Sequence, residues 1–289
     1  MRILCFDDSG VPRFGVRSGE RIHVHPDAAS PFELTDLTDP TSGDSDRTGW
    51  EERSIAGLTL LPPVPRPGKI VCIGLNYRQH AAEGGNAIPD YPAVFLRSTT
   101  SLLAPGAAML RPACSDKLDY EAELAVVIGV RAARVPVAAA LGHVAGYACF
   151  NDGSVRDYQR KSSQWTIGKN FDATGAFGPE LVTADEVPAG ARGLRIVSRV
   201  NGTVMQDSNT DDMIFDVATL VSVLSQAMTL EPGDVIATGT PAGVGYARNP
   251  PLFLRPGDRC EVEIEGIGVL SNGVADAGPD EPLRSARSW

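Results

Sequence analysis

Turn-forming residues interrupt this chain so often that it has little room for long helices. Its 289 residues include 30 glycines and 22 prolines, and both residue types break regular helices. One stretch, residues 215–228, repeats its apolar side chains with the spacing of an amphipathic helix. Most other apolar runs are short and end at turn-forming residues, as strands do. The sequence therefore predicts an α+β, β-rich fold with few helices.

Predicted strands and helices do not alternate regularly along the chain. This order disfavours a doubly wound parallel sheet and a TIM barrel, which both repeat strand and helix in turn. Asn201-Gly202 separates two predicted strands and favours a tight type I′ hairpin. Ser18-Gly19 is a second predicted hairpin turn, between predicted strands at 13–16 and 21–24. The remaining predicted strands are short apolar runs, at residues 2–6, 69–74, 118–129, 144–151, 235–238 and 260–265.

A proline-rich segment divides the chain into two parts. Residues 61–68 contain four prolines in eight positions, which favours a stiff, extended connector. The composition also changes after this segment, where the first strongly apolar run begins. We therefore predict a small β-containing N-terminal domain over residues 1–66 and a larger domain over residues 67–289.

Charge limits the classes of partner. The chain has 26 basic and 36 acidic residues, a formal net charge of −10, so a nucleic acid or an anionic membrane is not an expected partner. No run of 18 apolar residues is present, and the N-terminus lacks the apolar region of a signal peptide. Five scattered cysteines without a C-x-x-C pair are typical of reduced thiols. We expect a cytoplasmic protein.

Two acidic residues interrupt an otherwise apolar predicted strand. Glu121 and Glu123 are two positions apart, so a strand would point both carboxylates to one face. Their mutual repulsion would be relieved by a divalent cation, and oxygen ligands suit Mg²⁺ or Mn²⁺. The alternative is an ordinary solvated strand face.

Two further residues extend this pattern, each with an ordinary alternative. Asp152 follows a strand-like run, where a ligand would enter a cleft, but it could equally cap the next helix. Lys169 lies among aromatic residues and glycines and could stabilise an oxyanion, or it could be a surface lysine packed over Phe171.

A short predicted helix and a glycine-rich loop complete the candidate site. His80 and Glu83 are three positions apart on the helix, so the carboxylate could orient an imidazole as a general base. The alternative is an exposed contact on the helix surface. Residues 238–245, Thr-Gly-Thr-Pro-Ala-Gly-Val-Gly, could present amide groups to an anion, or simply form a tight loop.

In this order, the segments resemble the fumarylacetoacetate hydrolase family, over roughly residues 69–274. The resemblance implies a mixed β-sandwich roll, a homodimer, and Mg²⁺, Mn²⁺ or Ca²⁺ bound by two Glu and one Asp. Two positions depart from the pattern, since Tyr120 and Arg97 replace a His and a Lys that many members have. The resemblance carries roles over to these residues: metal ligands Glu121, Glu123 and Asp152; catalytic His80, Glu83 and Lys169; substrate-binding Tyr77, Arg97, Arg156, Gln159 and Thr240.

The resemblance leaves several functions open. Our leading hypothesis is a metal-dependent hydrolase that cleaves a C–C bond in a 1,3-diketo acid such as an acylpyruvate or a fumarylpyruvate-like substrate. One alternative keeps the metal site but decarboxylates, isomerises or tautomerises a 2-oxo or 2-hydroxydienoate acid. Another alternative is a non-catalytic protein that binds a small keto acid on the same scaffold.

Overall fold

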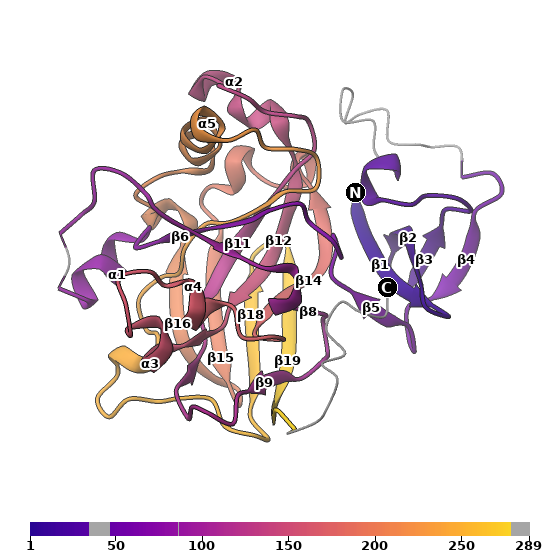
Figure 1. The fold of residues 1–289 in the computed structure, drawn as a ribbon. Coiled ribbons are helices and arrows are strands. Elements are labelled where there is room, and N and C mark those ends of the chain that lie inside the picture. The colour runs from indigo at the N-terminus through magenta and orange to yellow at the C-terminus, as the bar shows by residue number, and fades with distance from the viewer. Residues whose placement is uncertain (35–46, 86, 279–289) are drawn as a thin grey trace.

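Two β-sheets of unequal size form the framework of this computed structural model (Figure 1). The structure describes residues 1–34, 47–85 and 87–278. Within these residues the larger sheet has twelve strands in the order β4-β3-β2-β1-β14-β12-β11-β17-β6-β7, with β5 paired to β1 and β8 to β14. Its strands after the proline-rich segment are β6 (Ile70–Gly74), β7 (Ala93–Arg97), β8 (Leu102–Leu103), β11 (Ala122–Ile128), β12 (Val144–Asp152), β14 (Gly175–Thr183) and β17 (Val235–Ala237).

The second sheet packs against the larger one and has the order β16-β15-β18-β19-β9. A separate ribbon pairs β10 with β13. The strands of these two units are β9 (Met109–Arg111), β10 (Leu118–Asp119), β13 (Ser154–Val155), β15 (Arg195–Val200), β16 (Thr203–Asn209), β18 (Arg259–Ile264) and β19 (Gly268–Asp276).

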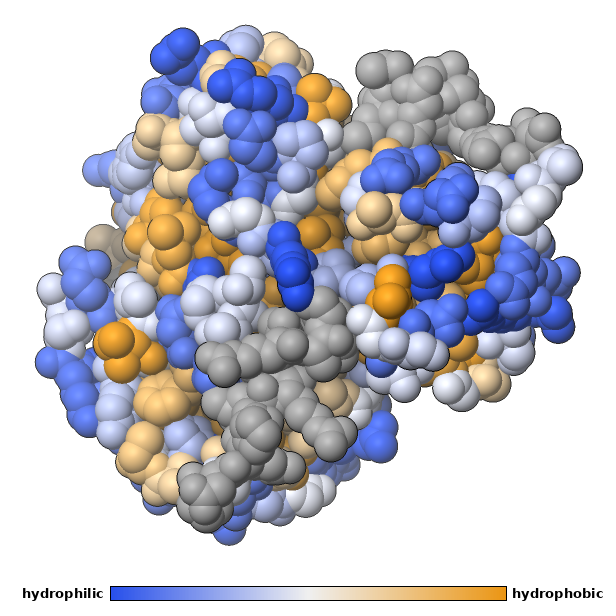
Figure 2. Space-filling model, turned by 45° about the vertical axis from the view of Figure 1, so that its right-hand side comes forward, coloured by the Kyte–Doolittle hydropathy of each residue, from blue (hydrophilic) through white to orange (hydrophobic). Residues whose placement is uncertain are grey.

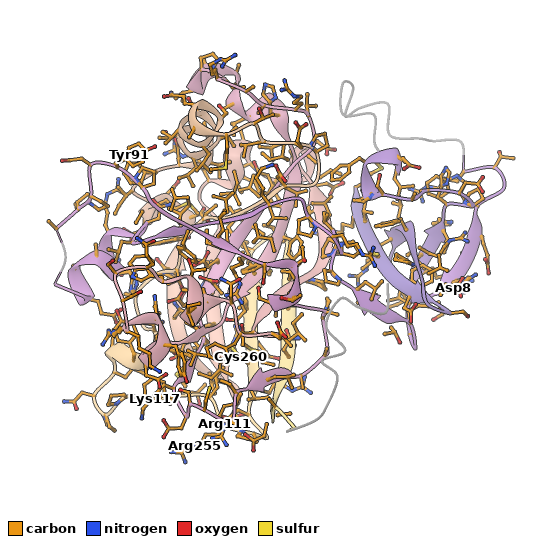
Figure 3. All side chains as sticks on the ribbon, viewed as in Figure 1. Asp8, Tyr91, Arg111, Lys117, Arg255 and Cys260 are labelled. Carbon is orange, nitrogen blue, oxygen red and sulfur yellow. The ribbon has the colours of Figure 1, made fainter. Side chains whose placement is uncertain are left out.

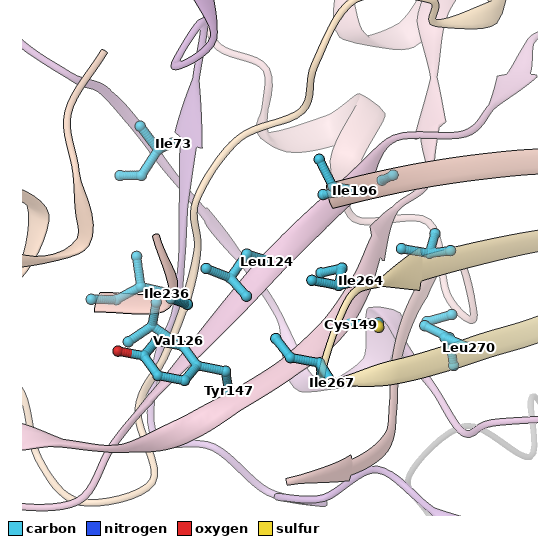
Figure 4. Close-up of a cluster of buried hydrophobic side chains, with 14 of the residues drawn as sticks. Ile73, Leu124, Val126, Tyr147, Cys149, Ile196, Ile236, Ile264, Ile267 and Leu270 are labelled. Carbon is cyan, nitrogen blue, oxygen red and sulfur yellow. The ribbon is translucent and has the colours of Figure 1, made fainter. Parts of the chain in front are cut away.

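The central strand β11 is buried along its whole length because both of its faces are covered. Leu124 and Val126 belong to the core cluster shared with the second sheet, which includes Ile264 (Figure 4). Ala125 and Val127 point to the other face and join a second cluster, which reaches the N-terminal strands. Because side chains alternate along β11, one of its faces packs with the second sheet and the other belongs to the cluster that includes the N-terminal strands.

The N-terminal strands extend the larger sheet, because β1 pairs antiparallel with β14. Buried Glu180 on β14 reinforces this junction, with Arg2 at 2.6 Å and Arg17 at 3.4 Å. Figure 1 shows these strands as a lobe beside the main body, and Figure 2 shows hydrophilic residues over much of its outer edge. The domain boundary at residue 66 stays a prediction. The strands are β1 (Arg2–Asp8), β2 (Val11–Ser18), β3 (Arg21–Val24), β4 (Glu51–Ser54) and β5 (Thr59–Leu61).

Helices in the described residues are few and short, and none is long and apolar enough to cross a membrane. The predicted helix at 215–228 is confirmed as α5 (Val217–Ala227), whose N-cap Asp216 accepts the amide hydrogen of Thr219. The others are α1 (Arg78–Glu83), α2 (Val137–Ala140), α3 (Arg156–Gln159), α4 (Thr166–Lys169) and the 3₁₀ turns η1 (Pro31–Leu34), η2 (Thr99–Ser101), η3 (Leu141–His143), η4 (Ala184–Glu186), η5 (Ala189–Ala191), η6 (Thr210–Asp212) and η7 (Gly245–Ala247).

The β-rich fold with few helices is confirmed, and so is the hairpin at Asn201-Gly202, where both residues have positive φ. The single strand predicted over residues 118–129 is wrong. The chain changes partner there, since β10 pairs with β13 whereas β11 pairs with β12. Glu121 lies in the gap between β10 and β11 and therefore belongs to neither strand.

We predict that Gly146→Ala destabilises the protein, because two strands approach closely at this glycine of β12. A Cβ atom there would lie 2.2 Å from the Val182 carbonyl oxygen, a backbone atom that cannot move aside. Overpacking of this kind lowers the free energy of unfolding by about 1–3 kcal/mol. Urea unfolding at unchanged m value measures the effect.

Gly273→Ala is the matched control, because a Cβ atom at this β19 position meets nothing within 4 Å. Its unfolding free energy should stay within about 0.5 kcal/mol of the wild-type value. Equal urea midpoints for the two variants would contradict the packing argument.

Candidate active site

Three buried carboxylates converge at one end of two neighbouring strands. Glu123 lies on β11, Asp152 ends β12, and Glu121 immediately precedes β11. Each offers a carboxylate oxygen that lies within 4.8 Å of the others, and all three residues are buried. The antiparallel pairing of β11 with β12, which sets Ala122 opposite Asn151, brings them together.

Glu121 reaches this cluster by a route that differs from the prediction of one continuous strand. Its amide donates to the Asn151 side-chain oxygen at 3.0 Å, and its carbonyl accepts the Asp152 amide hydrogen at 2.9 Å. These bonds fix Glu121 outside the regular strand, so the cluster is built by two strands and a connecting residue. The interpretation of Glu121 and Glu123 as a solvated strand face is wrong, since both are buried.

Three cationic side chains compensate two of the carboxylates. Lys169 Nζ lies 2.5 Å from both Glu121 Oε2 and Asp152 Oδ2. Arg156 Nη2 lies 2.6 Å from Glu121 Oε1, and Arg97 Nη1 lies 2.6 Å from Asp152 Oδ1. The alternative of a surface lysine at position 169 therefore fails, because its side chain is buried among acids.

The pKa values of the two glutamates move in opposite directions. Burial alone would raise the pKa of Glu121, but Arg156 and Lys169 outweigh it and lower the pKa to about 2. Burial, Asp152 and Glu121 raise the pKa of Glu123 well above its ordinary value. The Gly239 amide, which donates to Glu123 Oε2 at 2.9 Å, compensates only part of this effect.

This donor set fits a hard divalent cation. Buried carboxylate oxygens are the ligands that Mg²⁺ and Mn²⁺ prefer, and a cation would supply the positive charge that Glu123 lacks. Glu121, Glu123 and Asp152 are therefore the residues that could hold such an ion.

A histidine–carboxylate pair lies beside the cluster, at the cavity wall. His80 is buried on α1, and its Nδ1 lies 3.1 Å from Glu83 Oε2. Burial alone would raise the pKa of Glu83, but the hydrogen bonds with His80 and the Gly243 amide outweigh it and lower the pKa. His80 thus differs from an exposed surface contact. The Gly243 amide, which donates to Glu83 Oε1 at 3.0 Å, ties α1 to the glycine-rich loop.

A cavity of about 170 Å³ opens over the carboxylates, His80 and Lys169. This volume is small beside drug-sized pockets, which begin near about 300 Å³, so a small ligand fits best. The wall also includes three aromatic and three polar side chains: Phe95, Trp165, Tyr246, Gln159, Arg160 and Thr240. The guanidinium groups of Arg156 and Arg160 lie over the Tyr246 ring.

Two residues predicted to contact the substrate do not line this cavity. Arg97 is fully buried, where it donates to Asp152, to the Gly153 carbonyl and to Thr174 Oγ1. Tyr77 is also fully buried, and its hydroxyl has no hydrogen-bond partner within the described residues. The geometry therefore supports a positioning role for Arg97 and gives no basis for substrate contact by either residue.

Two further residues, Asp119 and Gln206, hold the site in shape but were not identified from the sequence. Gln206 Nε2 donates to Thr240 Oγ1 at 2.7 Å, which fixes the threonine hydroxyl at the cavity wall. Asp119 accepts hydrogen bonds from the Tyr246 amide and from Arg156 Nε. Neither residue belongs to a local pattern that signals a site, because its partners are distant in the sequence.

Tyr120, one of the two departures from the family pattern, braces the glycine-rich loop. Its hydroxyl donates to the Gly243 carbonyl at 3.1 Å and accepts a hydrogen bond from Arg248 Nε at 3.1 Å. Its side chain is buried, and it does not line the cavity.

This chain is similar to known proteins over most of its length. The family model described as Fumarylacetoacetate (FAA) hydrolase C-terminal matches residues 69–275. The chain is 45% identical over 219 residues to oxaloacetate tautomerase FAHD2A, mitochondrial, of Bos taurus, which covers 75% of this chain and 69% of the relative. It is 43% identical over 234 residues to oxaloacetate tautomerase YisK of Bacillus subtilis (strain 168), covering 80% of this chain and 77% of the relative.

Solved structures extend the likeness to the N-terminal strands. A fumarylacetoacetate hydrolase from psychrophilic Exiguobacterium antarcticum matches with a TM-score of 0.85 at 35% identity, covering 96% of this chain and all of that chain (100%). The 2-hydroxyhepta-2,4-diene-1,7-dioate isomerase from Mycobacterium marinum matches with a TM-score of 0.79 at 34% identity, covering 96% and 99%. The cytoplasmic location and the homodimer predicted for this chain stay predictions.

We predict that Arg97→Gln acts on stability, because it removes the charge that pairs with buried Asp152. Breaking a buried ion pair on one side costs about 3–5 kcal/mol of unfolding free energy. Urea unfolding measures this cost. Arg255→Gln, at an exposed arginine labelled in Figure 3, serves as the control and should be neutral. An Arg97 variant with wild-type stability would show that the pair is dispensable.

We also predict that Mn²⁺ binds the wild-type protein and that Glu123→Gln abolishes the binding, because an amide lacks the charge of the buried carboxylate. Isothermal titration with MnCl₂ measures the affinity directly, without any substrate. Glu20→Gln, in an exposed turn of the N-terminal lobe, is the control and should bind Mn²⁺ as the wild type does. Unchanged binding by Glu123→Gln would place the ion elsewhere.

Proposed function

This chain belongs to the fumarylacetoacetate hydrolase family, and from that premise we propose that it interconverts the keto and enol forms of a small 2-oxo acid with the help of a divalent cation. The observation that carries the proposal is that three buried carboxylates and His80, which is paired with Glu83, line one small cavity. Keto–enol interconversion requires the transfer of only one proton between carbon and oxygen, and a group that accepts and returns this proton is sufficient for it.

The comparisons favour isomerisation over the C–C bond hydrolysis that the sequence first suggests. Two relatives at 43–45% identity are named oxaloacetate tautomerases, and a structural neighbour is named a dioate isomerase. These names describe 2-oxo acids or their enol forms. We therefore take oxaloacetate as the first substrate to test.

The substrate's 2-oxo end would face the acidic cluster. A divalent cation bound by Glu121, Glu123 and Asp152 would polarise the 2-oxo group and stabilise negative charge on its oxygen. Thr240, whose hydroxyl accepts a hydrogen bond from Gln206, and Gln159 line the cavity wall, and we assign them to hydrogen bonds with the neighbouring carboxylate.

Lys169 supplies a second positive charge at the reacting oxygen. Burial alone would lower the pKa of Lys169, but Asp152 and Glu121 outweigh it and raise the pKa, so the ammonium stays protonated. As the proton leaves C3 of the substrate, negative charge builds on the 2-oxo oxygen. A fixed ammonium group beside that oxygen lowers the energy of the developing charge.

We assign the proton transfer to His80. Because Nδ1 faces Glu83, Nε2 is the ring nitrogen that would accept a proton from C3 and return it to the enol oxygen. One C–H bond breaks and one O–H bond forms, so the reaction needs neither water nor a further reactant. Glu83 fixes the ring orientation that this transfer requires.

Hydrolysis is the second candidate, and the same His80–Glu83 pair supports it because an oriented imidazole can also deprotonate water. The structural neighbour named fumarylacetoacetate hydrolase gives the same support. Decarboxylation would use the same cation and lysine. The substrate's fate therefore distinguishes these reactions better than the site does.

We predict that the Mn²⁺-loaded protein accelerates ketonisation of enol oxaloacetate, measured by loss of enol absorbance, without CO₂ release or new carboxylates. Lys169→Met should lower kcat about 10²–10³-fold, because one charged donor at the oxyanion is lost. Lys117→Met, at a partly exposed lysine outside this cavity, should keep wild-type turnover.

Mass spectrometry and CO₂ detection on an acylpyruvate and oxaloacetate panel complete the test. A carboxylate pair as product would establish hydrolysis, and CO₂ would establish decarboxylation. Mn²⁺ binding without any turnover would favour the non-catalytic keto acid binder.

A further inference from the structure

Two arginines lie over the ring of one tyrosine at the cavity wall. The guanidinium carbons of Arg156 and Arg160 each lie 4.4 Å from the centroid of the Tyr246 ring. All three side chains line the cavity that holds the carboxylate cluster. Arg156 is buried next to Glu121, whereas Arg160 is exposed. The stack therefore leads from the acidic cluster toward the solvent.

The inner arginine is already engaged with protein groups. Arg156 Nε donates to Asp119 at 2.8 Å, Nη1 donates to Gln159 at 2.9 Å, and Nη2 lies 2.6 Å from Glu121. The family resemblance assigns Arg156 to substrate binding, but Nε and Nη1 already donate to protein groups, and Nη2 is buried against Glu121 and makes no hydrogen bond within the described residues. Its charge balances the acidic cluster.

The charge of Arg160, the outer arginine, is not compensated by a carboxylate of the described residues. Among the residues that the structure describes, no carboxylate pairs with Arg160, and its side-chain contact is the face of Tyr246. The other cations at the cavity, Lys169 and Arg156, both contact carboxylates. Arg160 is thus a cation of the wall that protein acids do not neutralise.

Hydrogen bonds and close packing fix the position of Tyr246 and of the turn that carries Arg160. Asp119 Oδ2 accepts the Tyr246 amide hydrogen at 2.9 Å, so the phenol is anchored by its own backbone. The Arg160 amide donates to the Arg156 carbonyl at 3.2 Å, which fixes the end of α3. Gly168 of α4 packs so closely on Gln159 that a Cβ atom would lie 2.3 Å from its amide nitrogen. The helix that carries Lys169 and the turn that carries Arg160 therefore keep one geometry.

We infer that Arg160 is the specificity-determining residue for a second carboxylate, and that it selects a short 2-oxo dicarboxylic acid over a 2-oxo monocarboxylic acid. This inference rests on the proposed function, because it places the 2-oxo end at the acidic cluster and the far end toward Arg160. The cavity volume of about 170 Å³ limits the distance between the two ends and favours a short chain.

An arginine suits this task better than a lysine. Its planar guanidinium can stack on Tyr246 and still present two N–H groups in parallel to a carboxylate. Because the stacked group is already ordered, binding costs less conformational entropy than ordering a free side chain. Because Arg160 would contact only the far carboxylate and not the reacting atoms, its substitution should change KM rather than kcat.

The test compares two substrates in wild type and Arg160→Gln with Mn²⁺ present: oxaloacetate, and its 4-methyl ester, which lacks the far negative charge. We expect Arg160→Gln to raise KM for oxaloacetate about tenfold to a hundredfold, the range for a hydrogen bond to a charged group. Its kcat should stay near wild type, and KM for the ester should change less than about twofold. Arg160→Lys should fall between wild type and Arg160→Gln for oxaloacetate.

Calorimetric titration with oxalate gives a readout that does not depend on turnover. Oxalate can chelate the cation but has no second carboxylate beyond the chelating pair, so Arg160→Gln should bind it as wild type does. Arg255→Gln, the exposed arginine labelled in Figure 3, should match wild type in every measurement.

The outcomes separate this inference from the proposed function. If wild type turns over oxaloacetate and Arg160→Gln has the same KM, the inference is overturned while the function stands. A large loss of oxalate affinity would overturn it too, because Arg160 would then support the inner site. If wild type turns over neither substrate, the function fails, and weaker oxaloacetate binding by Arg160→Gln in calorimetry would still support the assignment.

Discussion

Repulsion among three buried carboxylates is the constraint around which this site is built. Carboxylate oxygens of Glu121, Glu123 and Asp152 lie within 4.8 Å of one another at one end of β11, a strand that is buried along its whole length. Such a group persists in a low-dielectric interior only with compensating charge. The compensation comes from separate elements, Arg97 at the end of β7, Arg156 in α3 and Lys169 in α4. These three elements each bring a cation to Glu121 or Asp152, whereas the pKa of Glu123 is raised instead.

Polar side chains around the carboxylate cluster are also held by hydrogen bonds to one another and to the backbone. Asp119 joins Arg156 to the loop that begins at Gly245, and Gln206 holds the Thr240 hydroxyl. The glycine-rich loop is also bonded to Glu83 and Tyr120 through Gly243. The His80–Glu83 pair, the Thr240 hydroxyl and the carboxylate cluster are therefore positioned by one connected network of polar groups, and such networks favour one geometry.

Local patterns in the sequence predict much of this molecule. Apolar periodicity identifies the helix at 215–228, Asn-Gly identifies the hairpin at 201–202, and the acidic motif identifies the carboxylates that meet in space. Contacts between distant segments are what local patterns cannot supply. The break between β10 and β11 depends on a change of partner strand, and the burial of Arg97 depends on Asp152, 55 positions away. Arg160 resembles any exposed arginine until the fold sets it over Tyr246.

The central claim is that the three carboxylates form a divalent-metal centre at which a 2-oxo acid is held. The most direct measurement is a crystal structure of the protein grown with Mn²⁺ and oxalate, with anomalous data at the manganese edge. The account predicts one strong anomalous peak in contact with Glu121, Glu123 and Asp152, with oxalate completing its ligands between Lys169 and Thr240. An absence of manganese at these carboxylates, with oxalate bound elsewhere, would contradict it.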